Sequence, residues 1–182
     1  MNFFKYIIEL GKNVMAKDPA AKSLFVSIFM NPGVKAQSYH YLAHKLYNNG
    51  NYFLSTFLSH RARKITGIEI HPGAKLGRRI LMDHGMGIVI GETAIVGDDV
   101  TIFHGVTLGG IGGEPNKKRH PTIGNGVLIG TGTSVLGNIT IGDKSKIGAN
   151  SVVLEDIPPY VTAVGSPARV VKKEKYAGLY VI

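Results

Sequence analysis

The chain has 182 residues, of which 44% are hydrophobic and 18% are charged, a composition that supports a folded core and argues against disorder. It contains no cysteine, which excludes disulfides, thiolate metal sites and a cysteine acyl-enzyme. The formal net charge of +9 is compatible with nucleic acid, an anionic membrane or a small polyanionic ligand, and composition does not decide among them.

Residues 1–66 are predicted to be α-helical. Asp18 followed by Pro19 is typical of a helix N-cap with proline at the first helical position, so a helix is expected to begin there. The region is too small for an independent core, so we expect it to pack on the first coil of the structure that follows and to cover its edge. Three helices are expected, over about 18–31, 34–47 and 52–64.

An aliphatic residue returns at every sixth position through the rest of the chain, and glycine follows most of these residues directly. A period of six matches neither a helix nor a simple strand alternation. It is typical of a triangular solenoid, in which each hexapeptide is one short strand plus a corner and the aliphatic side chain points inward. The main series is Ile90, Val96, Ile102, Leu108, Ile123, Ile129, Val135, Ile141, Ile147 and Val153. An earlier run, Ile70, Leu76, Met82 and Ile88, has the same period but is two residues out of phase.

The repeat predicts a mainly β fold with an α-helical N-terminal region, in which residues 67–171 form a parallel β-helix of hexapeptide repeats. Fifteen positions separate Leu108 from Ile123, which is not a multiple of six, so residues of about 110–121 are expected to leave the coil as an extruded loop. The loop is rich in glycine and basic residues, and such loops on rigid scaffolds often bind ligands. Residues 172–182 are expected to form a C-terminal tail.

Two polar clusters in the repeat region are candidates for catalysis or binding. In the first, Asp83 adjoins His84 where the aliphatic spacing is interrupted, and histidine is the natural group to take a proton from an alcohol. The second is the basic run 117–120, whose Arg119 is suited to binding a carboxylate and whose charge suits phosphates. From the spacing alone, a solvated corner and a solvated charge run explain these clusters at least as well.

Two further pairs contain histidine. Glu69 and His71 flank a core position, and a carboxylate near an imidazole can fix its tautomer, although exposure on a coil face fits the spacing equally. His40 and His44 are one helical turn apart and could bind zinc, but no third ligand is suggested nearby. We therefore expect no metal site.

Seven stretches that run in order over nearly the whole chain carry a resemblance to a known family. They are residues 17–20, 67–74, 82–85, 89–93, 105–110, 119–121 and 164–169. On these stretches the chain resembles the serine acetyltransferases, which are hexapeptide-repeat acyltransferases. Single hexapeptides are shared by many acyltransferases, whereas the Asp-Pro-Ala, Asp-His and Arg-His-Pro elements in this order are far more specific.

The resemblance implies a left-handed β-helix and a homotrimer with active sites between neighbouring subunits. It also implies transfer of the acetyl group of acetyl-CoA to the hydroxyl of L-serine, the first step of cysteine biosynthesis from serine. His84 is then the general base, supported by Glu69 where the family usually has aspartate, with His120 as a further catalytic residue. Asp18 and Asp83 would hold the serine ammonium group. The remaining implied roles are binding of the serine carboxylate by Arg119 and His120, and of acetyl-CoA by the backbone around Gly110, Thr131 and Ala149.

The resemblance also bears on partners. The helical region is shorter than in family members that join two trimers, which leaves a lone trimer and a dimer of trimers both open. The terminal Ile182 resembles the family tail that inserts into O-acetylserine sulfhydrylase, so that enzyme is an expected partner. Neither a signal peptide nor a membrane span is indicated, so we expect a cytoplasmic protein without membrane or nucleic-acid partners.

Three other functions remain open at this point. The first is an O-acetyltransferase of the same fold that acts on a sugar or xenobiotic hydroxyl, which would not need paired carboxylates and an arginine for a zwitterion. The second is a metal-dependent hydratase of the carbonic-anhydrase type, for which His84, His104 and His120 could be proposed as ligands, although their spacing does not fit that family. The third is a non-catalytic scaffold, which would leave the polar clusters unexplained.

Overall fold

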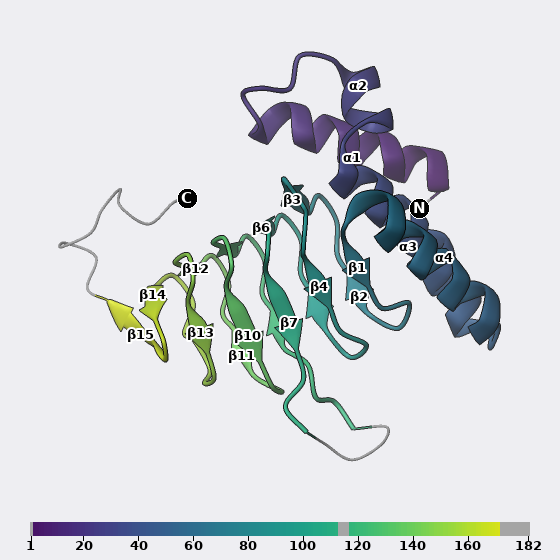
Figure 1. Ribbon diagram of the computed structural model, residues 1–182. Coiled ribbons are helices and arrows are strands. Elements are labelled where there is room, and N and C mark those ends of the chain that lie inside the picture. The colour runs from purple at the N-terminus through teal and green to yellow at the C-terminus, as the bar shows by residue number, and fades with distance from the viewer. Residues whose placement is uncertain (1, 113–116, 172–182) are drawn as a thin grey trace.

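Four helices precede a solenoid of short strands in the computed structural model, which describes residues 2–112 and 117–171 (Figure 1). The helices gather at the end of the solenoid where the first coil begins, and α3 and α4 contact β1. None of the described helices has the length and apolar character needed to cross a membrane. The helices are α1 (Phe3–Lys17), α2 (Leu24–Phe29), α3 (Pro32–Asn48) and α4 (Tyr52–Thr66).

The expected helix start at Asp18 is wrong. Asp18 is the C-cap of α1, its backbone N–H donates to the carbonyl of Val14 at 2.8 Å, and its carboxylate accepts from the N–H of Ala20 at 2.8 Å. The next helix, α2, has Ser23 as its N-cap. An aspartate before proline can form a local turn as readily as a helix cap, so the dipeptide alone did not decide between a helix start and a helix end.

Successive strands lie on three different sheets, and each strand pairs in parallel with the strand three further along the chain. There are two exceptions: β12 pairs in parallel with β14, two strands further along, and β15 pairs antiparallel with β14. The first sheet contains β1 (Glu69–Ile70), β4 (Val89–Ile90), β7 (Thr107–Gly109), β10 (Ser134–Leu136) and β13 (Val152–Val153). The second contains β2 (Lys75–Leu76), β5 (Ile95–Val96), β8 (Thr122–Ile123) and β11 (Thr140–Ile141). The third contains β3 (Leu81–Asp83), β6 (Thr101–Phe103), β9 (Leu128–Ile129), β12 (Lys146–Ile147), β14 (Thr162–Gly165) and β15 (Ala168–Val171).

The core of the solenoid is the stack of aliphatic side chains that the repeat predicted. Along the first sheet the register partners Ile70, Ile90, Leu108, Val135 and Val153 are all buried. Each such side chain contributes about 1.5–3 kcal/mol when it is removed from water. The predicted hexapeptide repeat and the left-handed parallel β-helix are therefore confirmed. Each inward-facing aliphatic residue stacks on the equivalent residue of the next coil.

The phase shift between the two aliphatic runs has a structural cause. Five residues, 84–88, join β3 to β4, whereas three residues, 104–106, join β6 to β7. The backbone of the longer connection is left-handed at His84 (φ 57°) and at Gly85 (φ 75°). A positive φ is uncommon for a residue other than glycine, so this widened corner holds His84 in a specific conformation. The two additional residues that shifted the repeat are the ones that build the corner presenting His84.

Helix α1 is docked on the first coil by polar contacts. Asn13 donates its side-chain amide to the carbonyl of Arg79 at 2.8 Å, and Lys17 donates to the carbonyls of Arg79 and Asp99, both at 3.2 Å. Glu9 pairs with the guanidinium of Arg78 at 2.5 Å. These contacts hold α1 against the first two coils at the corner between the second and third sheets.

Candidate functional site

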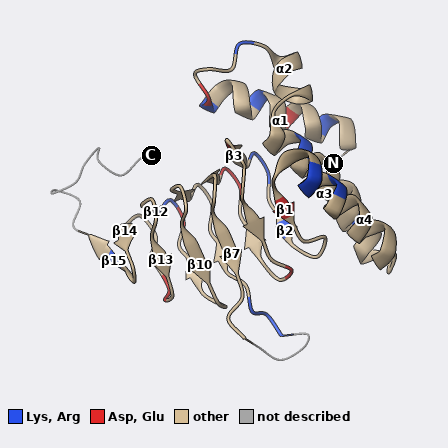
Figure 2. Ribbon diagram, in the orientation of Figure 1, with Lys and Arg blue, Asp and Glu red and all other residues tan. Residues whose placement is uncertain are grey.

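The predicted site residues are distributed over different corners of the triangular solenoid. We call the corner from the third sheet to the first, residues 84–88, 104–106, 130–133 and 148–151, the histidine corner. We call the corner from the first sheet to the second, where residues 91–94 and the extruded loop lie, the loop corner. The loop leaves the solenoid at the bottom of Figure 1, and its basic residues are blue in Figure 2.

A column of equivalent residues runs along the histidine corner. Met82, Ile102, Ile129 and Ile147 are successive register partners, and two positions after each lie His84, His104, Thr131 and Ala149. The rings of His84 and His104 meet edge to face with centroids 5.6 Å apart. Backbone hydrogen bonds continue the stack. The N–H of Gly132 donates to the carbonyl of His104, and the N–H of Asn150 donates to the carbonyl of Thr131. The structure therefore brings the predicted base and two predicted acetyl-CoA residues onto one corner.

The carboxylates predicted beside His84 are placed differently from one another. Asp83 ends β3 and is half-buried beside His84 on the outer face, because the adjacent Met82 points into the core. Glu69 follows Gly67, whose carbonyl accepts from Gly87 of the widened corner at 2.9 Å. Glu69 is therefore two residues from a backbone contact with the histidine corner. Its carboxylate, however, is paired with Arg63 of α4 at 3.0 Å. Within the described chain no hydrogen bond joins Glu69 to His84.

The loop corner holds the predicted carboxylate-binding residues. Arg119 is paired through Nη2 with Glu92 Oε2 at 3.0 Å, and the other oxygen of Glu92 accepts from the hydroxyl of Tyr47 at 2.9 Å. His120 is buried against Thr93, whose hydroxyl oxygen accepts from the backbone N–H of both Arg119 and His120. Gly110 lies beside the same two loop residues, with its Cβ position 3.3 Å from His120 Nε2.

Burial changes the protonation of two groups at the loop corner. It lowers the pKa of His120 from its ordinary value, and the neighbouring Arg119 lowers it further, so His120 is neutral at physiological pH. Burial also lowers the pKa of Lys118, with the nearby Lys75 acting in the same direction. Lys118 donates to the carbonyls of Thr93 at 3.1 Å and His120 at 2.5 Å, which holds the end of the loop against the solenoid.

Asp18 lies at neither of these corners. It follows α1, and the preceding Lys17 contacts Asp99 at the third corner, between the second and third sheets. The Asp18 carboxylate is engaged with Ala20. No ion pair or hydrogen bond in the described chain joins it to Asp83 or His84, so the two predicted ammonium ligands are not gathered by one subunit.

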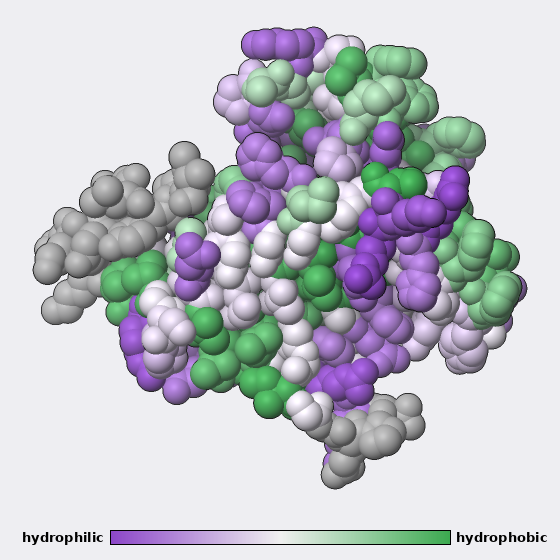
Figure 3. Space-filling view, viewed as in Figure 1, coloured by the Kyte–Doolittle hydropathy of each residue, from purple (hydrophilic) through white to green (hydrophobic). Residues whose placement is uncertain are grey.

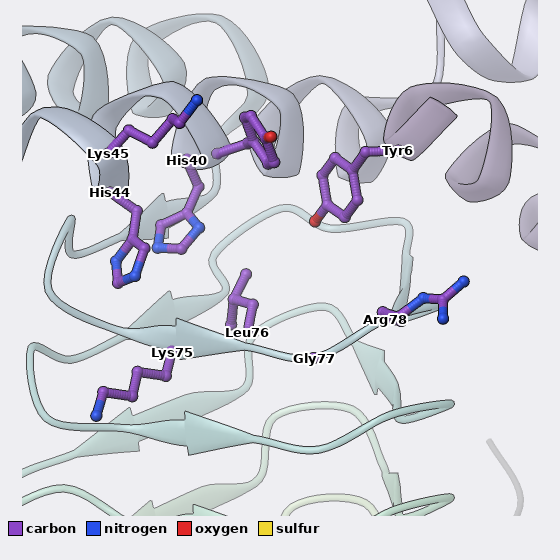
Figure 4. A pocket seen from close by; sticks show the side chains of 9 residues that line it. Tyr6, His40, His44, Lys45, Lys75, Leu76, Gly77 and Arg78 are labelled. Atoms are coloured by element: carbon purple, nitrogen blue, oxygen red, sulfur yellow. The ribbon is translucent and has the colours of Figure 1, made fainter. Parts of the chain in front are cut away.

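A pocket of about 360 Å³ lies between the helices and β2 (Figure 4). It includes the His40 and His44 pair, whose rings stack with centroids 5.4 Å apart. His44 Nδ1 is 2.7 Å from the carbonyl of Pro72 and its Nε2 is 3.0 Å from the amide of Asn48, so both ring nitrogens are engaged. In the described residues no three or more His, Cys, Asp or Glu side chains are arranged to hold a metal ion. The residues that line the pocket are Tyr6, His40, Tyr41, His44, Lys45, Lys75, Leu76, Gly77 and Arg78.

Sequence reasoning did not assign a role to Glu92, Thr93 or Tyr47. Glu92 and Thr93 follow Gly91 at a corner whose equivalent one coil later carries the extruded loop, so they lie directly against the returning end of that loop. The offset of one coil between these residues and the loop could have predicted their contact from the sequence. Tyr47 lies on a helix far from the loop in sequence, and no repeat relates the two, so its contact with Glu92 could not be read from spacing.

Comparisons with known proteins agree with this architecture. The family described as bacterial transferase hexapeptide (six repeats) matches residues 120–155. A serine acetyltransferase of Helicobacter pylori is 54% identical over 164 residues, covering 90% of this chain and 95% of that protein. A crystal structure of serine acetyltransferase from Neisseria gonorrhoeae in complex with serine is 42% identical, with a TM-score of 0.88, and the match covers 93% of this chain and 69% of that one. The serine acetyltransferase of Brucella abortus in complex with coenzyme A is 43% identical, with a TM-score of 0.88, over 92% of this chain and 68% of that one.

Proposed function

The chain belongs to the serine acetyltransferase family, and we propose that it transfers the acetyl group of acetyl-CoA to the hydroxyl of L-serine, giving O-acetyl-L-serine and CoA. The observation that carries this assignment is the column on the histidine corner. An exposed histidine held on a rigid turn shares its register position with Thr131 and Ala149, where the family's acetyl-CoA groove is expected. The reaction places this chain at the first step of cysteine biosynthesis from serine.

His84 is the proposed general base. The serine oxygen attacks the thioester carbonyl, the imidazole of His84 takes the hydroxyl proton, and the proton passes to the sulfur of CoA as the carbon–sulfur bond breaks. General-base catalysis of this kind is worth roughly 10²–10⁴-fold in rate. Because the chain has no cysteine, direct transfer within a ternary complex is the economical route. Glu69 is the proposed support for His84, which requires its carboxylate to leave Arg63.

Serine is a zwitterion, and the remaining proposed residues match its two charged ends. Asp83 and Asp18 bind the ammonium group, and Arg119 and His120 bind the carboxylate. The exposed charge pair between Arg119 and Glu92 leaves other guanidinium nitrogens available for a bidentate contact. The backbone at Gly110, next to His120, lies where the acetyl-CoA groove reaches the loop.

A homotrimer is proposed because the two halves of the site lie on different corners of the same subunit. The base lies at the histidine corner and the carboxylate-binding residues lie at the loop corner, which are different corners of one triangular section. Three copies related by a closed three-fold axis can place the loop corner of one subunit against the histidine corner of the next. Four exposed phenylalanines on α2 and α4 are candidates for joining two trimers, namely Phe25, Phe29, Phe53 and Phe57. Figure 3 shows apolar residues at the surface of the helical region.

Two further proposals concern the cell. We place the enzyme in the cytoplasm, and we propose that the C-terminal Ile182 binds O-acetylserine sulfhydrylase. Ile182 lies outside the described residues. Co-elution of the two enzymes tests this partnership, and a chain truncated by that single residue should lose it. Unchanged co-elution after the deletion would count against the proposal.

Assay of purified protein with acetyl-CoA and a panel of acceptors tests the main function. Release of the CoA thiol with L-serine, and none with sugars or xenobiotic alcohols, is expected. Transfer to a sugar with no transfer to serine would instead support the rival acetyltransferase. Equilibrium sedimentation of the same sample distinguishes a trimer from a dimer of trimers.

A further inference from the structure

The hydroxyl of Thr93 is the centre of the hydrogen bonds that hold the end of the extruded loop. Its oxygen accepts from the backbone N–H of Arg119 at 3.0 Å and from that of His120 at 3.1 Å. The same oxygen lies 2.9 Å from Nδ1 of the His120 ring. The backbone N–H of Thr93 also points at Nδ1, at 3.2 Å. One residue of the loop corner thus contacts both the main chain and the side chain of His120.

Counting donors and acceptors fixes the direction of these bonds. A hydroxyl has two lone pairs and one proton, and the two backbone N–H groups use the lone pairs of Thr93. Its proton is therefore directed to Nδ1, which already receives the backbone N–H of Thr93. A ring nitrogen that accepts cannot carry a proton, so the neutral imidazole of His120 must carry its proton on Nε2.

We infer that Thr93 is a positioning residue that fixes His120 as the Nε2–H tautomer, a neutral hydrogen-bond donor rather than a proton acceptor. Burial and Arg119 lower the pKa of His120, while Glu92 raises it and His71 and Lys118 lower it, and the balance keeps the ring neutral. The donor edge of the ring faces two glycines. A Cβ at Gly91 would overlap the imidazole, and Gly110 lies beside Nε2. In the described part of the chain no acceptor is bonded to Nε2, so its N–H remains available to a ligand.

The consequence for catalysis rests on the proposed function. An N–H donor beside Arg119 suits one oxygen of the serine carboxylate, while the guanidinium binds the other. A neutral ring on the Nε2–H tautomer binds an anionic oxygen without taking its proton. His120 then acts in substrate binding, and proton transfer is left to His84. Thr93 influences serine through His120 and the backbone of Arg119, without touching the substrate itself.

Nitrogen-15 NMR of the imidazole rings tests the tautomer directly in the full-length protein without any substrate. His120 is assigned by comparison with His120→Asn. In the unaltered protein its Nδ1 should have the shift of an unprotonated nitrogen and its Nε2 that of a protonated one. The opposite assignment, or a charged ring at neutral pH, would overturn the inference.

Two variants test whether the Thr93 hydroxyl is responsible. Thr93→Val keeps the shape and the backbone N–H but removes the hydroxyl, the nearer of the two donors to Nδ1, so the Nδ1 resonance should move part of the way towards that of a tautomer mixture. Thr93→Ser restores the hydroxyl and should restore the original spectrum. An unchanged spectrum in Thr93→Val would show that the hydroxyl does not fix the ring.

Kinetics separate this inference from the proposed function. With serine as acceptor, Thr93→Val should raise KM for serine about tenfold, as expected for a lost hydrogen-bond donor, and leave KM for acetyl-CoA unchanged. Thr93→Ser should return KM for serine to near the original value. If the unaltered protein transfers no acetyl group to serine, the proposed function fails and the NMR result still stands. If the NMR shows the other tautomer in an active enzyme, only the inference fails.

Discussion

His84 and His104 occupy the same register position in adjacent coils, and their rings meet edge to face with centroids 5.6 Å apart. His84 lies on the widened corner and has a left-handed backbone, whereas His104 lies on the shorter corner one coil later. Two chemically identical side chains are therefore presented on different backbones at the same corner. Their comparison is a matched test of which histidine is the base.

His84→Ala should lower kcat by at least about 100-fold, the lower end of what general-base catalysis contributes. Circular dichroism and the elution volume should stay unchanged, because the side chain is exposed and contributes little to the core. His104→Ala is the control and should reduce kcat far less. A nearly fully active His84→Ala, or a larger loss in His104→Ala, would show that the base has been assigned to the wrong residue.

Asp83→Asn should raise KM for serine while KM for acetyl-CoA stays the same. The amide keeps the shape of the side chain but removes the negative charge that the serine ammonium needs. Loss of a charged hydrogen bond predicts an increase of about 10- to 100-fold. Steady-state kinetics with each substrate varied in turn measures both constants, and an equal rise in both would indicate general damage rather than loss of ammonium binding.

Glu92→Gln should raise KM for serine several-fold with little loss of stability. The Glu92–Arg119 pair is partly exposed, at 35% and 39% of the two side chains, and exposed pairs contribute about 0–1 kcal/mol. Its effect should therefore come from the orientation of Arg119. Tyr47→Phe removes only the hydroxyl that binds the other oxygen of Glu92, so its effect should be smaller. Thermal melting that fell sharply in Glu92→Gln would contradict this separation.

Stability should fall as the pH drops below about 6.5, because of His40. Burial, chiefly, lowers the pKa of this histidine from its ordinary 6.5 to about 3 in the folded chain. Between these values the unfolded state binds a proton that the folded state does not, so stability increases with pH there and is lost as the pH falls. One proton corresponds to at most about 1.4 kcal/mol per pH unit.

Urea unfolding at several values between pH 5 and 7 measures this slope, in a range where most carboxylates stay ionised. His40→Gln keeps a polar side chain of similar size and should flatten the slope relative to the unaltered protein. His60→Gln changes an exposed histidine and serves as the control. Equal slopes in the unaltered protein and in His40→Gln would mean that His40 is not the titrating group.

The amino-acid sequence by itself determined the solenoid and the register of its core. A six-residue period is a local property, and identical units can bury their aliphatic side chains only by stacking on one another. Even the two-residue phase shift between Ile88 and Ile90 was visible, and it corresponds to the widened corner at His84. The existence of an extruded loop followed from the same arithmetic, because the fifteen positions between Leu108 and Ile123 are not a multiple of six.

Only the tertiary structure decided which polar residues meet. Asp18 ends a helix instead of beginning one. The local turn at Asp-Pro is compatible with both a helix start and a helix end, and the packing of α1 on the solenoid favours the helix end. Glu69 meets Arg63, and Tyr47 meets Glu92, across separations that no repeat relates. A period specifies which residues face inward. It does not specify which polar residues share a corner. The division of the proposed site between the histidine corner and the loop corner was therefore visible only in the tertiary structure.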